Sequence, residues 1–428
     1  MLLVGNGTLL TMGPKPRVIE RGAVLVEGER VSRVGGTDEL RALDPAATYI
    51  DAGGRLIMPG LINAHAHLYS AFAQGMAESG MFTQTPQGTG WKLSRELSLA
   101  DTYYSAMLHL IEGIKHGITS VIAHHSSPGA VRGSLPALAK AAGDVGVRAC
   151  FCYEVSDRDG EKDTLEGILE NAGFLLSCQE SSGLLHGLFG IHPGLSDESL
   201  RNCRTVAKKF DAGFHLHAVL GGGGRKKGGE SQRGFERLDS FGILGPETIA
   251  AHFLQLNGRE LELLQRSGTW VVYNPQLGSG EEAVPVREML TGGIGVALGT
   301  DIYCNDMFES ARRVAGSPGA CAADISSVLY RNNPRLASGL FGGVLGELVP
   351  GALADIIIVD CKAAIPPVCL SWQKSLVDAV SGSCVETTIV NGQVKMLERR
   401  LVELDENEVY VIAREYAAKL WYKITEKC

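Results

Sequence analysis

Hydrophobic positions follow one pattern at the two ends of the chain and a different one between them. At both ends, short apolar runs alternate with turns, at the spacing of β-hairpins. The strands predicted there are Met1–Val4, Ala23–Val26, Arg30–Val34, Ala354–Val359, Glu386–Val390 and Gln393–Met396. The pair Asn391-Gly392 predicts a tight hairpin turn between the last two. We expect the two β-rich ends to pair in space as one domain.

Between these ends the pattern changes to a strand followed by a helix, repeated along the chain. Eight candidate strands carry it: Asn63–His67, Ser120–His124, Arg148–Tyr153, Leu188–His192, His215–Leu220, Ala250–Phe253, Val271–Asn274 and Val296–Asp301. The intervening helices include Leu99–Lys115, Pro136–Val145 and Arg259–Arg266. Alternating strands and helices indicate a parallel sheet, and eight units indicate a closed barrel. An open doubly wound sheet fits less well, because no Gly-rich phosphate loop follows an early strand.

These patterns predict an α/β protein, a (β/α)8 TIM barrel with a small β-sandwich domain formed by both chain ends. The predicted boundaries are 1–57 with 346–400 for the β-sandwich, 58–345 for the barrel and 401–428 for a C-terminal helix. In that helix, apolar residues recur at helical spacing, so that one face packs on the body. They are Val409, Ile412, Ala413, Tyr416, Leu420 and Ile424.

Composition narrows the choice of partners and compartment. The net charge is −8, and the densest basic cluster, Arg225-Lys226-Lys227, is short and lies in a Gly-rich stretch, so nucleic acid is not an expected partner. The 54 glycines show no period and indicate many tight turns. The ten cysteines are scattered, as in a reduced compartment. Neither a signal peptide nor a long apolar run is evident, so we expect a cytoplasmic protein without a membrane partner.

Residues that can bind a metal fall repeatedly at the predicted strand ends. The first strand closes on His65-Ala66-His67, and because side chains on a strand alternate, both imidazoles point the same way. The fifth strand carries a second such pair that ends on His217, the sixth carries His252, and the eighth ends on Asp301. One H-x-H pair is weak evidence by itself. Their order, at the end of a barrel where reactive groups gather, predicts a metal site.

Several segments then resemble a known family. Met58–His67 resembles the opening motif of the amidohydrolase superfamily, and Gly299-Thr300-Asp301 resembles the motif of its eighth strand. The run Gly117-Ile118-Thr119-Ser120 resembles the second-strand motif, and Leu348–Asp355 resembles the return into the small β-domain. The resemblance covers essentially the whole chain and is closest to the chlorohydrolase/deaminase branch, particularly the SsnA-type aminohydrolases. The segments that favour this branch are Ala123–Pro128 and Asp306–Ser310.

The resemblance implies roles for the residues of the site. His65, His67 and His217 would be metal ligands, and Asp301 both a ligand and the general base. His252 would hold the attacking water or the developing oxyanion. One divalent metal is implied; this ligand set best suits Zn²⁺ and also accepts Fe²⁺ or Mn²⁺. Such a metal lowers the pKa of its water to about 7, and the expected reaction is hydrolytic deamination of a nucleobase-like heterocycle.

The chain also departs from the deaminase pattern. Deaminases of this branch carry a glutamate three residues after the fifth-strand ligand, where this chain has Leu220. Leucine cannot carry a proton, and a general acid–base group typically contributes about 10²–10⁴-fold to the rate. Glu230, beyond four consecutive glycines, is a candidate replacement. Gln255 and the run Tyr273–Leu277 also differ from the residues of many relatives.

Three functions therefore stay open at this point. The first is an aminohydrolase with a rearranged proton path. The second is a metal-dependent hydrolase of cyclic amides or ureides, in which Asp301 alone shuttles the proton. The third is a metal-binding barrel that has lost turnover and serves as a partner subunit.

Three further residues are candidates for substrate binding. His125 resembles a substrate-side residue of the SsnA-type proteins, and because adjacent strand residues face opposite ways, only one of His124 and His125 can line the mouth. His192 follows the fourth strand at a position that commonly contacts substrate in this branch. Trp91 lies in the long connection after the first strand, which is typical of a lid. The resemblance also implies a homo-oligomer, a dimer or larger.

Overall fold

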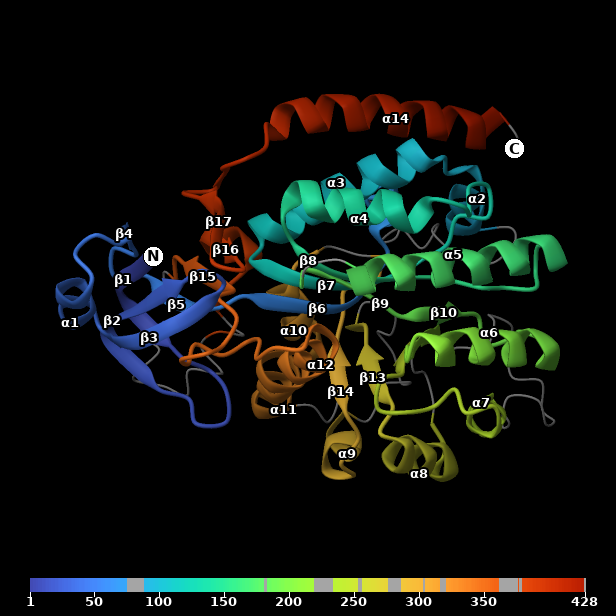
Figure 1. Ribbon diagram of the computed structural model, residues 1–428, viewed down its shortest axis with the longest axis horizontal. Helices are drawn as coiled ribbons and strands as arrows, with labels where there is room; N and C mark the ends of the chain where they lie inside the picture. Colours follow the sequence, from blue (N-terminus) through green and yellow to red (C-terminus); the bar gives the residue numbers. More distant parts are fainter. Residues whose placement is uncertain are drawn as a thin grey trace.

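The computed structural model describes residues 1–74, 88–180, 183–218, 234–252, 256–275, 286–302, 305–315, 321–361, 376 and 379–426. In Figure 1 a β-rich part, built from both ends of the chain, lies beside a larger part in which helices surround parallel strands. The long C-terminal helix crosses the top of the view.

The two chain ends form one mixed sheet, as the sequence predicts. Its strand order is β18-β17-β16-β15-β5-β1-β2-β3, with β4 paired to β1. The N-terminal elements are β1 (Leu2–Leu10), β2 (Val18–Glu27), β3 (Arg30–Gly36), α1 (Thr37–Leu43), β4 (Thr48–Asp51) and β5 (Leu56–Pro59). The C-terminal strands are β15 (Ile356–Val359), β16 (Val385–Val390), β17 (Gln393–Leu397) and β18 (Arg400–Leu401). The ends meet where β5 pairs antiparallel with β15.

The predicted hairpin turn between β16 and β17 is confirmed. Asn391 and Gly392 have φ angles of 52° and 76°, the left-handed conformation that a two-residue turn of this kind requires at both positions. The prediction missed β4 and β5 as separate strands and α1 as a helix. The two-layer arrangement of a sandwich stays a prediction, since the described strands form one continuous hydrogen-bonded sheet.

The middle of the chain supplies parallel strands in two hydrogen-bonded segments. The first is β6 (Leu61–Ala66), β7 (Ile118–His125), β8 (Arg148–Tyr153) and β9 (Leu185–Gly187). The second is β10 (Phe189–Ile191), β11 (Phe214–His217), β12 (Ile249–Ala251), β13 (Trp270–Tyr273) and β14 (Val296–Leu298). A parallel bridge between Val155 and Ile191 joins the segments on one side, and one between Ala66 and Asp301 joins them on the other.

Helices follow most of these strands. They are α2 (Thr89–Glu96), α3 (Leu99–Lys115), α4 (Ser134–Val145), α5 (Glu161–Glu180), α6 (Asp197–Lys209), α7 (Gly234–Ser240), α8 (Gly258–Ser267), α9 (Val286–Thr291), α10 (Met307–Ala315), α11 (Ala322–Ser327) and α12 (Asn333–Phe341). The predicted helix Leu99–Lys115 is observed with the same bounds, and Ser98 caps it through a bond to the backbone N–H of Asp101.

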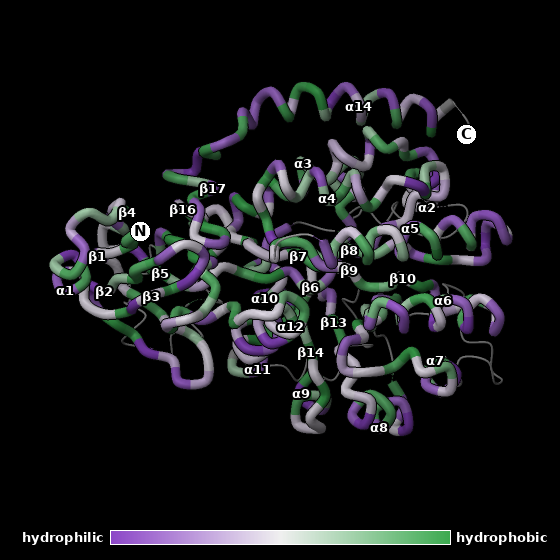
Figure 2. Tube along the Cα trace, in the orientation of Figure 1, coloured by the Kyte–Doolittle hydropathy of each residue, from purple (hydrophilic) through white to green (hydrophobic). Residues whose placement is uncertain are grey.

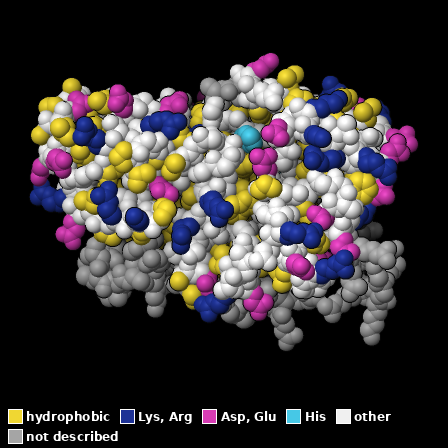
Figure 3. Space-filling view, turned by 60° about the horizontal axis from the view of Figure 1, so that its bottom comes forward, with side chains coloured by type: hydrophobic (Ala, Val, Ile, Leu, Met, Phe, Trp, Pro, Cys, Tyr) yellow, Lys and Arg dark blue, Asp and Glu magenta, His cyan; other side chains and the backbone are white. Residues whose placement is uncertain are grey.

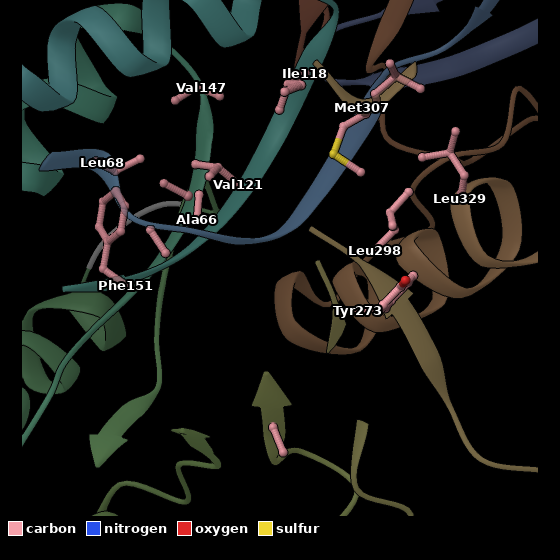
Figure 4. Packing of buried hydrophobic residues seen from close by; sticks show 14 of the residues in the cluster. Ala66, Leu68, Ile118, Val121, Val147, Phe151, Tyr273, Leu298, Met307 and Leu329 are labelled. Atoms are coloured by element: carbon pink, nitrogen blue, oxygen red, sulfur yellow. The ribbon is translucent and has the colours of Figure 1, made fainter. Parts of the chain in front are cut away.

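Side chains on the parallel strands alternate between two apolar cores. One core joins inward residues of β7, β8, β12, β13 and β14, so the inner faces of the two segments meet. The other core lies between the outer faces of the strands and the helices. In Figure 4, Val121 and Phe151 from β7 and β8 and Leu298 from β14 belong to this outer core, together with Met307 of α10. This alternation decides which residues at the strand ends point inward.

The C-terminal helix α14 (Glu406–Glu426) packs on α2 and α3 as predicted. Ala413, Leu420 and Ile424 are buried in a cluster with Leu93 and Leu97. Hydrophobic and hydrophilic residues alternate along α14 in Figure 2, as a surface helix requires.

The described surface carries charges of both signs. Figure 3 shows Lys and Arg interspersed with Asp and Glu on the face that it presents, rather than gathered by sign. Within the described part of the chain, no helix combines the length and apolar character that crossing a membrane requires.

Candidate metal centre

The predicted ligands converge at the C-terminal ends of the parallel strands. Nε2 atoms of His65, His67 and His252 each lie 3.4 Å from Oδ1 of Asp301. Nε2 of His217 lies 3.2 Å from Nε2 of His67. Nitrogens of the four histidines lie within 4.8 Å of one another, although the residues come from β6 and the residue directly after it, from β11, and from the loop after β12. The structure therefore brings together the five residues that the sequence predicts.

Two of these rings are held by polar neighbours on other strands. Nδ1 of His67 donates to the backbone carbonyl of His124 at 2.7 Å, which leaves its Nε2 without a hydrogen and free to bind a metal. Nδ1 of His65 lies 2.8 Å from Nε2 of His215. His215 is buried and contacts the ring of a predicted ligand.

The other two rings have different partners. Nδ1 of His217 lies 3.3 Å from Oε2 of Glu154. Nδ1 of His252 lies 3.1 Å from Nδ2 of Asn274. With the amide in this orientation Asn274 donates, so the hydrogen of the His252 ring is on Nε2, facing Asp301. His252 then suits a hydrogen-bond donor better than a ligand.

The backbone at two of these residues is in a conformation that L-amino acids rarely adopt. The φ angles of His252 and Asp301 are 65° and 59°. Each costs of order 1–3 kcal/mol and persists only where the surrounding structure enforces it. His252 directly follows β12, and Asp301 lies three residues after the end of β14. In this conformation the two side chains face each other, with Nε2 of His252 3.4 Å from Oδ1 of Asp301.

Only a glycine fits at position 299, directly after β14. A Cβ atom at Gly299 would lie 2.5 Å from Oδ1 of Asn274 and 2.7 Å from the carbonyl oxygen of His65. That same carbonyl accepts from the backbone N–H of Asp301 at 3.0 Å. A side chain here would separate the first and last strands at the point where they carry ligands.

The donor set fits a divalent metal. Nε2 of His65 is buried without a hydrogen-bond partner among the described residues, which is costly unless something else binds it. Burial lowers the pKa of His67 to about 4 and that of His252 to about 3, so both rings are neutral at pH 7. Neutral imidazoles and one carboxylate form a mixed nitrogen and oxygen set suited to Zn²⁺, Fe²⁺ or Mn²⁺.

Glu154 is a residue of this site that the sequence analysis missed. It directly follows β8, where Cys150 and Cys152 face the inner core, so the strand alternation carries its side chain inward. Its Oε1 accepts from Arg158 at 2.8 Å, while Oε2 faces His217. Burial raises the pKa of Glu154, but the hydrogen bond from His217 and the neighbouring charges outweigh it and hold the pKa well below its usual value. A carboxylate directly after a predicted strand was the available signal.

Comparisons with known proteins agree with this geometry. The model of the amidohydrolase family matches residues 56–395. The chain belongs to the amidohydrolase family. It is 29% identical over 438 residues to the 5′-deoxyadenosine deaminase of Methanosarcina mazei, covering 98% of each chain. It is 30% identical to the 5-methylthioadenosine/S-adenosylhomocysteine deaminase of Thermococcus sibiricus, over 92% of this chain and 94% of that protein.

Solved structures show the fold of this amidohydrolase. An adenosine deaminase from Xanthomonas campestris with bound zinc is similar with a TM-score of 0.82, at 22% identity and 98% coverage of each chain. An atrazine chlorohydrolase from Arthrobacter aurescens, complexed with zinc and atraton, gives a TM-score of 0.80 at 20% identity, over 97% of this chain and all of that one. The predicted TIM-barrel class is thereby confirmed.

The predicted substrate residues do not all face the metal centre. His124, not His125, faces the metal centre, with its ring centroid 4.4 Å from that of His217. His125 points to the outer side, where Nε2 lies 3.0 Å from Oγ of Ser127. His192 follows β10, and burial lowers the pKa of its ring. A substrate role for His125 and His192 stays a prediction.

Trp91 lies on α2, beside the barrel mouth. Its half-buried ring is covered by the guanidinium of Arg95 at 4.6 Å, and Arg95 forms an ion pair with Asp159, in the loop after β8. This ion pair ties α2 to the loop that carries Glu154. Other positions that the sequence analysis considered lie outside the described residues: Leu220, Glu230, Gln255, Gln276 and Leu277.

Two buried histidines outside the ligand set make the stability of this amidohydrolase depend on pH. Burial, with a contribution from the charge of His67, lowers the pKa of both His109 and His125 to about 3. Above pH 6.5 both are neutral whether the chain is folded or unfolded. Below pH 6.5 only the unfolded chain takes up these protons, so the free energy of unfolding falls by about 1.4 kcal/mol per pH unit for each histidine until pH approaches 3.

The test compares urea unfolding of the wild type and His109→Met between pH 6 and pH 4, both with chelator present. The variant should show a slope shallower by about 1.4 kcal/mol per pH unit. Equal slopes in the two proteins would mean that His109 is protonated in the folded state.

Proposed function

We propose that this amidohydrolase is a metal-dependent aminohydrolase that uses one divalent ion, Zn²⁺ in preference to Fe²⁺ or Mn²⁺, to replace the exocyclic amine of a nucleobase-like heterocycle with oxygen and release ammonia. The observation that carries the proposal is the convergence of His65, His67 and His217 on one point beside Asp301. These three imidazoles and the carboxylate of Asp301 would hold the metal, which would supply a water of lowered pKa when bound.

The names of the relatives support a narrower substrate class. 5′-Deoxyadenosine, 5-methylthioadenosine and S-adenosylhomocysteine share the adenine base and differ at the 5′ position. We propose that the substrate of this chain is an adenine nucleoside whose 5′ group varies. His192, His125 and Trp91 are the proposed substrate contacts. Trp91 offers an aromatic face for a flat base, whereas His125 is buried on the outer side of its strand and would have to turn to reach a substrate.

The chain's own residues divide the remaining work. When bound, the metal supplies a water whose pKa is near 7 and polarises the substrate. The carboxylate of Asp301, within 3.4 Å of three ring nitrogens, takes the proton of the attacking water. His252, with its hydrogen on Nε2, donates to the oxygen that forms at the attacked carbon. Both protons of the water must move, and Asp301 would carry each in turn. The first would go to the ring nitrogen beside the attacked carbon, and the second, from the new hydroxyl, to the amine, which leaves as ammonia.

A second candidate function follows from Leu220, where relatives carry the glutamate that protonates the ring. Hydrolysis of a cyclic amide or ureide needs no proton on a ring nitrogen before attack, so Asp301 alone could serve that reaction. This candidate predicts ring opening without ammonia.

One experiment separates the candidates. Purified protein is analysed for metal and then assayed for ammonia release on adenosine, 5′-deoxyadenosine and 5-methylthioadenosine, and for ring opening on hydantoin and dihydropyrimidine substrates. We expect one zinc per chain and ammonia release that depends on it. Metal with ring opening alone would favour the cyclic amidase, and metal without turnover on any substrate would favour the partner subunit.

The proposed organisation keeps the predicted boundaries, a β-sandwich from 1–57 and 346–400, a barrel from 58–345 and a helix from 401–428. We also propose a cytoplasmic homo-oligomer. The pairing of β5 with β15 supports the composite domain.

A further inference from the structure

Each of the four imidazole rings of this site has a polar partner at its Nδ1 atom, and only the Nδ1 partner of His217 is a charged group. His65 is held by a histidine ring, His67 by a backbone carbonyl and His252 by an amide. Nδ1 of His217 instead faces the carboxylate of Glu154, which is 8% exposed. The two oxygens of this carboxylate have different partners, since Arg158 donates to Oε1 and His217 faces Oε2.

The carboxylate of Glu154 determines which nitrogen of His217 carries the hydrogen. A carboxylate has no hydrogen to give, so His217 must place its hydrogen on Nδ1 to satisfy it. Nε2, the atom 3.2 Å from Nε2 of His67, then carries the lone pair. An anion on the far side of the ring also makes the imidazole a stronger electron donor.

We infer that Glu154 is a positioning residue, which acts through His217 to fix its tautomer and raise its affinity for the metal. This inference rests on the proposed metal site and assigns a function to a side chain outside the ligand set. Arg158 completes the arrangement: it comes from the same loop, has a partly exposed side chain, and forms an ion pair with the other oxygen of the carboxylate.

The loop geometry supports a dedicated position for this side chain. The backbone N–H of Glu154 donates to the carbonyl of His125 at 2.7 Å, and the N–H of Val155 donates to that of Gly190 at 3.1 Å. Both neighbouring strands therefore fix the backbone at Glu154. Its side chain lies between His217 on one strand and His124, 4.0 Å away, on another.

The test measures zinc affinity by competition with a chromophoric chelator, on apo-protein reloaded at pH 7.5. Glu154→Gln, which keeps the size but loses the charge, should weaken zinc binding about 10–100-fold, the range found for such outer partners. The matched control is Asp157→Asn, which neutralises a carboxylate on the same loop that bonds Ser196 and Ser199 instead of His217. Its zinc affinity should match that of the wild type.

A second background distinguishes positioning from a general structural effect. In His217→Asn, which lacks the ring, adding Glu154→Gln should change zinc affinity by less than about 3-fold, because coupled residues are not additive. A loss of 10–100-fold in that background, or none in the single variant, would overturn the inference. So would two zinc ions per wild-type chain with one retained in Glu154→Gln, because Glu154 would then be a ligand. A wild type that binds no zinc would overturn the proposed function itself.

Discussion

Asp301→Ala should reduce hydrolysis at least about 10²–10⁴-fold and weaken metal binding in the same protein, because one carboxylate serves two purposes. Its Oδ1 is the atom on which Nε2 of His65, His67 and His252 converge. Its removal takes away the only described anion among these nitrogens and the group that accepts the proton. The measurements are zinc content after dialysis and the initial rate of ammonia release.

Asp301→Asn separates the two effects. The amide keeps the size and one oxygen that can contact the metal, so metal content should fall less than in Asp301→Ala. It cannot accept a proton, so the rate should fall as far. If Asp301→Ala retained both the zinc content and the rate of the wild type, the site assignment would be wrong.

Asp355→Ala should give the largest loss of stability. Asp355 accepts from Arg148 at 3.2 and 3.4 Å, and both side chains are only 1% exposed. Arg148 also donates to Asn391 at 3.0 Å, so the cluster ties β8 of the barrel to the composite sheet. Removing one partner of a buried ion pair leaves an uncompensated charge and typically costs about 3–5 kcal/mol. Urea unfolding in the presence of zinc measures the effect.

The double variant Arg148→Met with Asp355→Leu is the control for that result. It replaces both charges with apolar groups of similar size, and such replacements are often neutral or stabilising. We expect the double variant to be more stable than Asp355→Ala. A single variant as stable as the wild type would show that the sheet from the chain ends does not depend on this contact.

The residues that converge at the candidate metal centre could be predicted from the sequence because they are encoded by local pattern and by order. A residue at the end of a strand in an α/β barrel lies at the mouth whatever the rest of the chain does. The H-x-H spacing puts His65 and His67 on one side of their strand. The pairing of the two ends was likewise predictable, because both are β-rich and flank a middle with a different pattern.

The alternation of side chains shows that His124 and His125 point to opposite faces of β7, but it does not say which face points inward. That choice depends on which face of β7 contacts the helices, and the outer core that includes Val121 and Ala123 decides it. Glu154 was missed for a related reason. A carboxylate after a strand is common, and its meaning here comes from His217, which lies far away in the sequence.

The sequence by itself determined the strand-then-helix pattern that predicts the barrel. The resemblance of its motifs predicted the family, which the family match confirms, and a ligand set that stays a prediction. Only the tertiary structure decided how each imidazole is oriented. Orientation depends on the atom that faces the second ring nitrogen, and those atoms, on Glu154, His215, Asn274 and the carbonyl of His124, come from other strands. A hydrogen bond between strands joins atoms about 3 Å apart in space whose residues are far apart in the sequence, so no local sequence pattern predicts it.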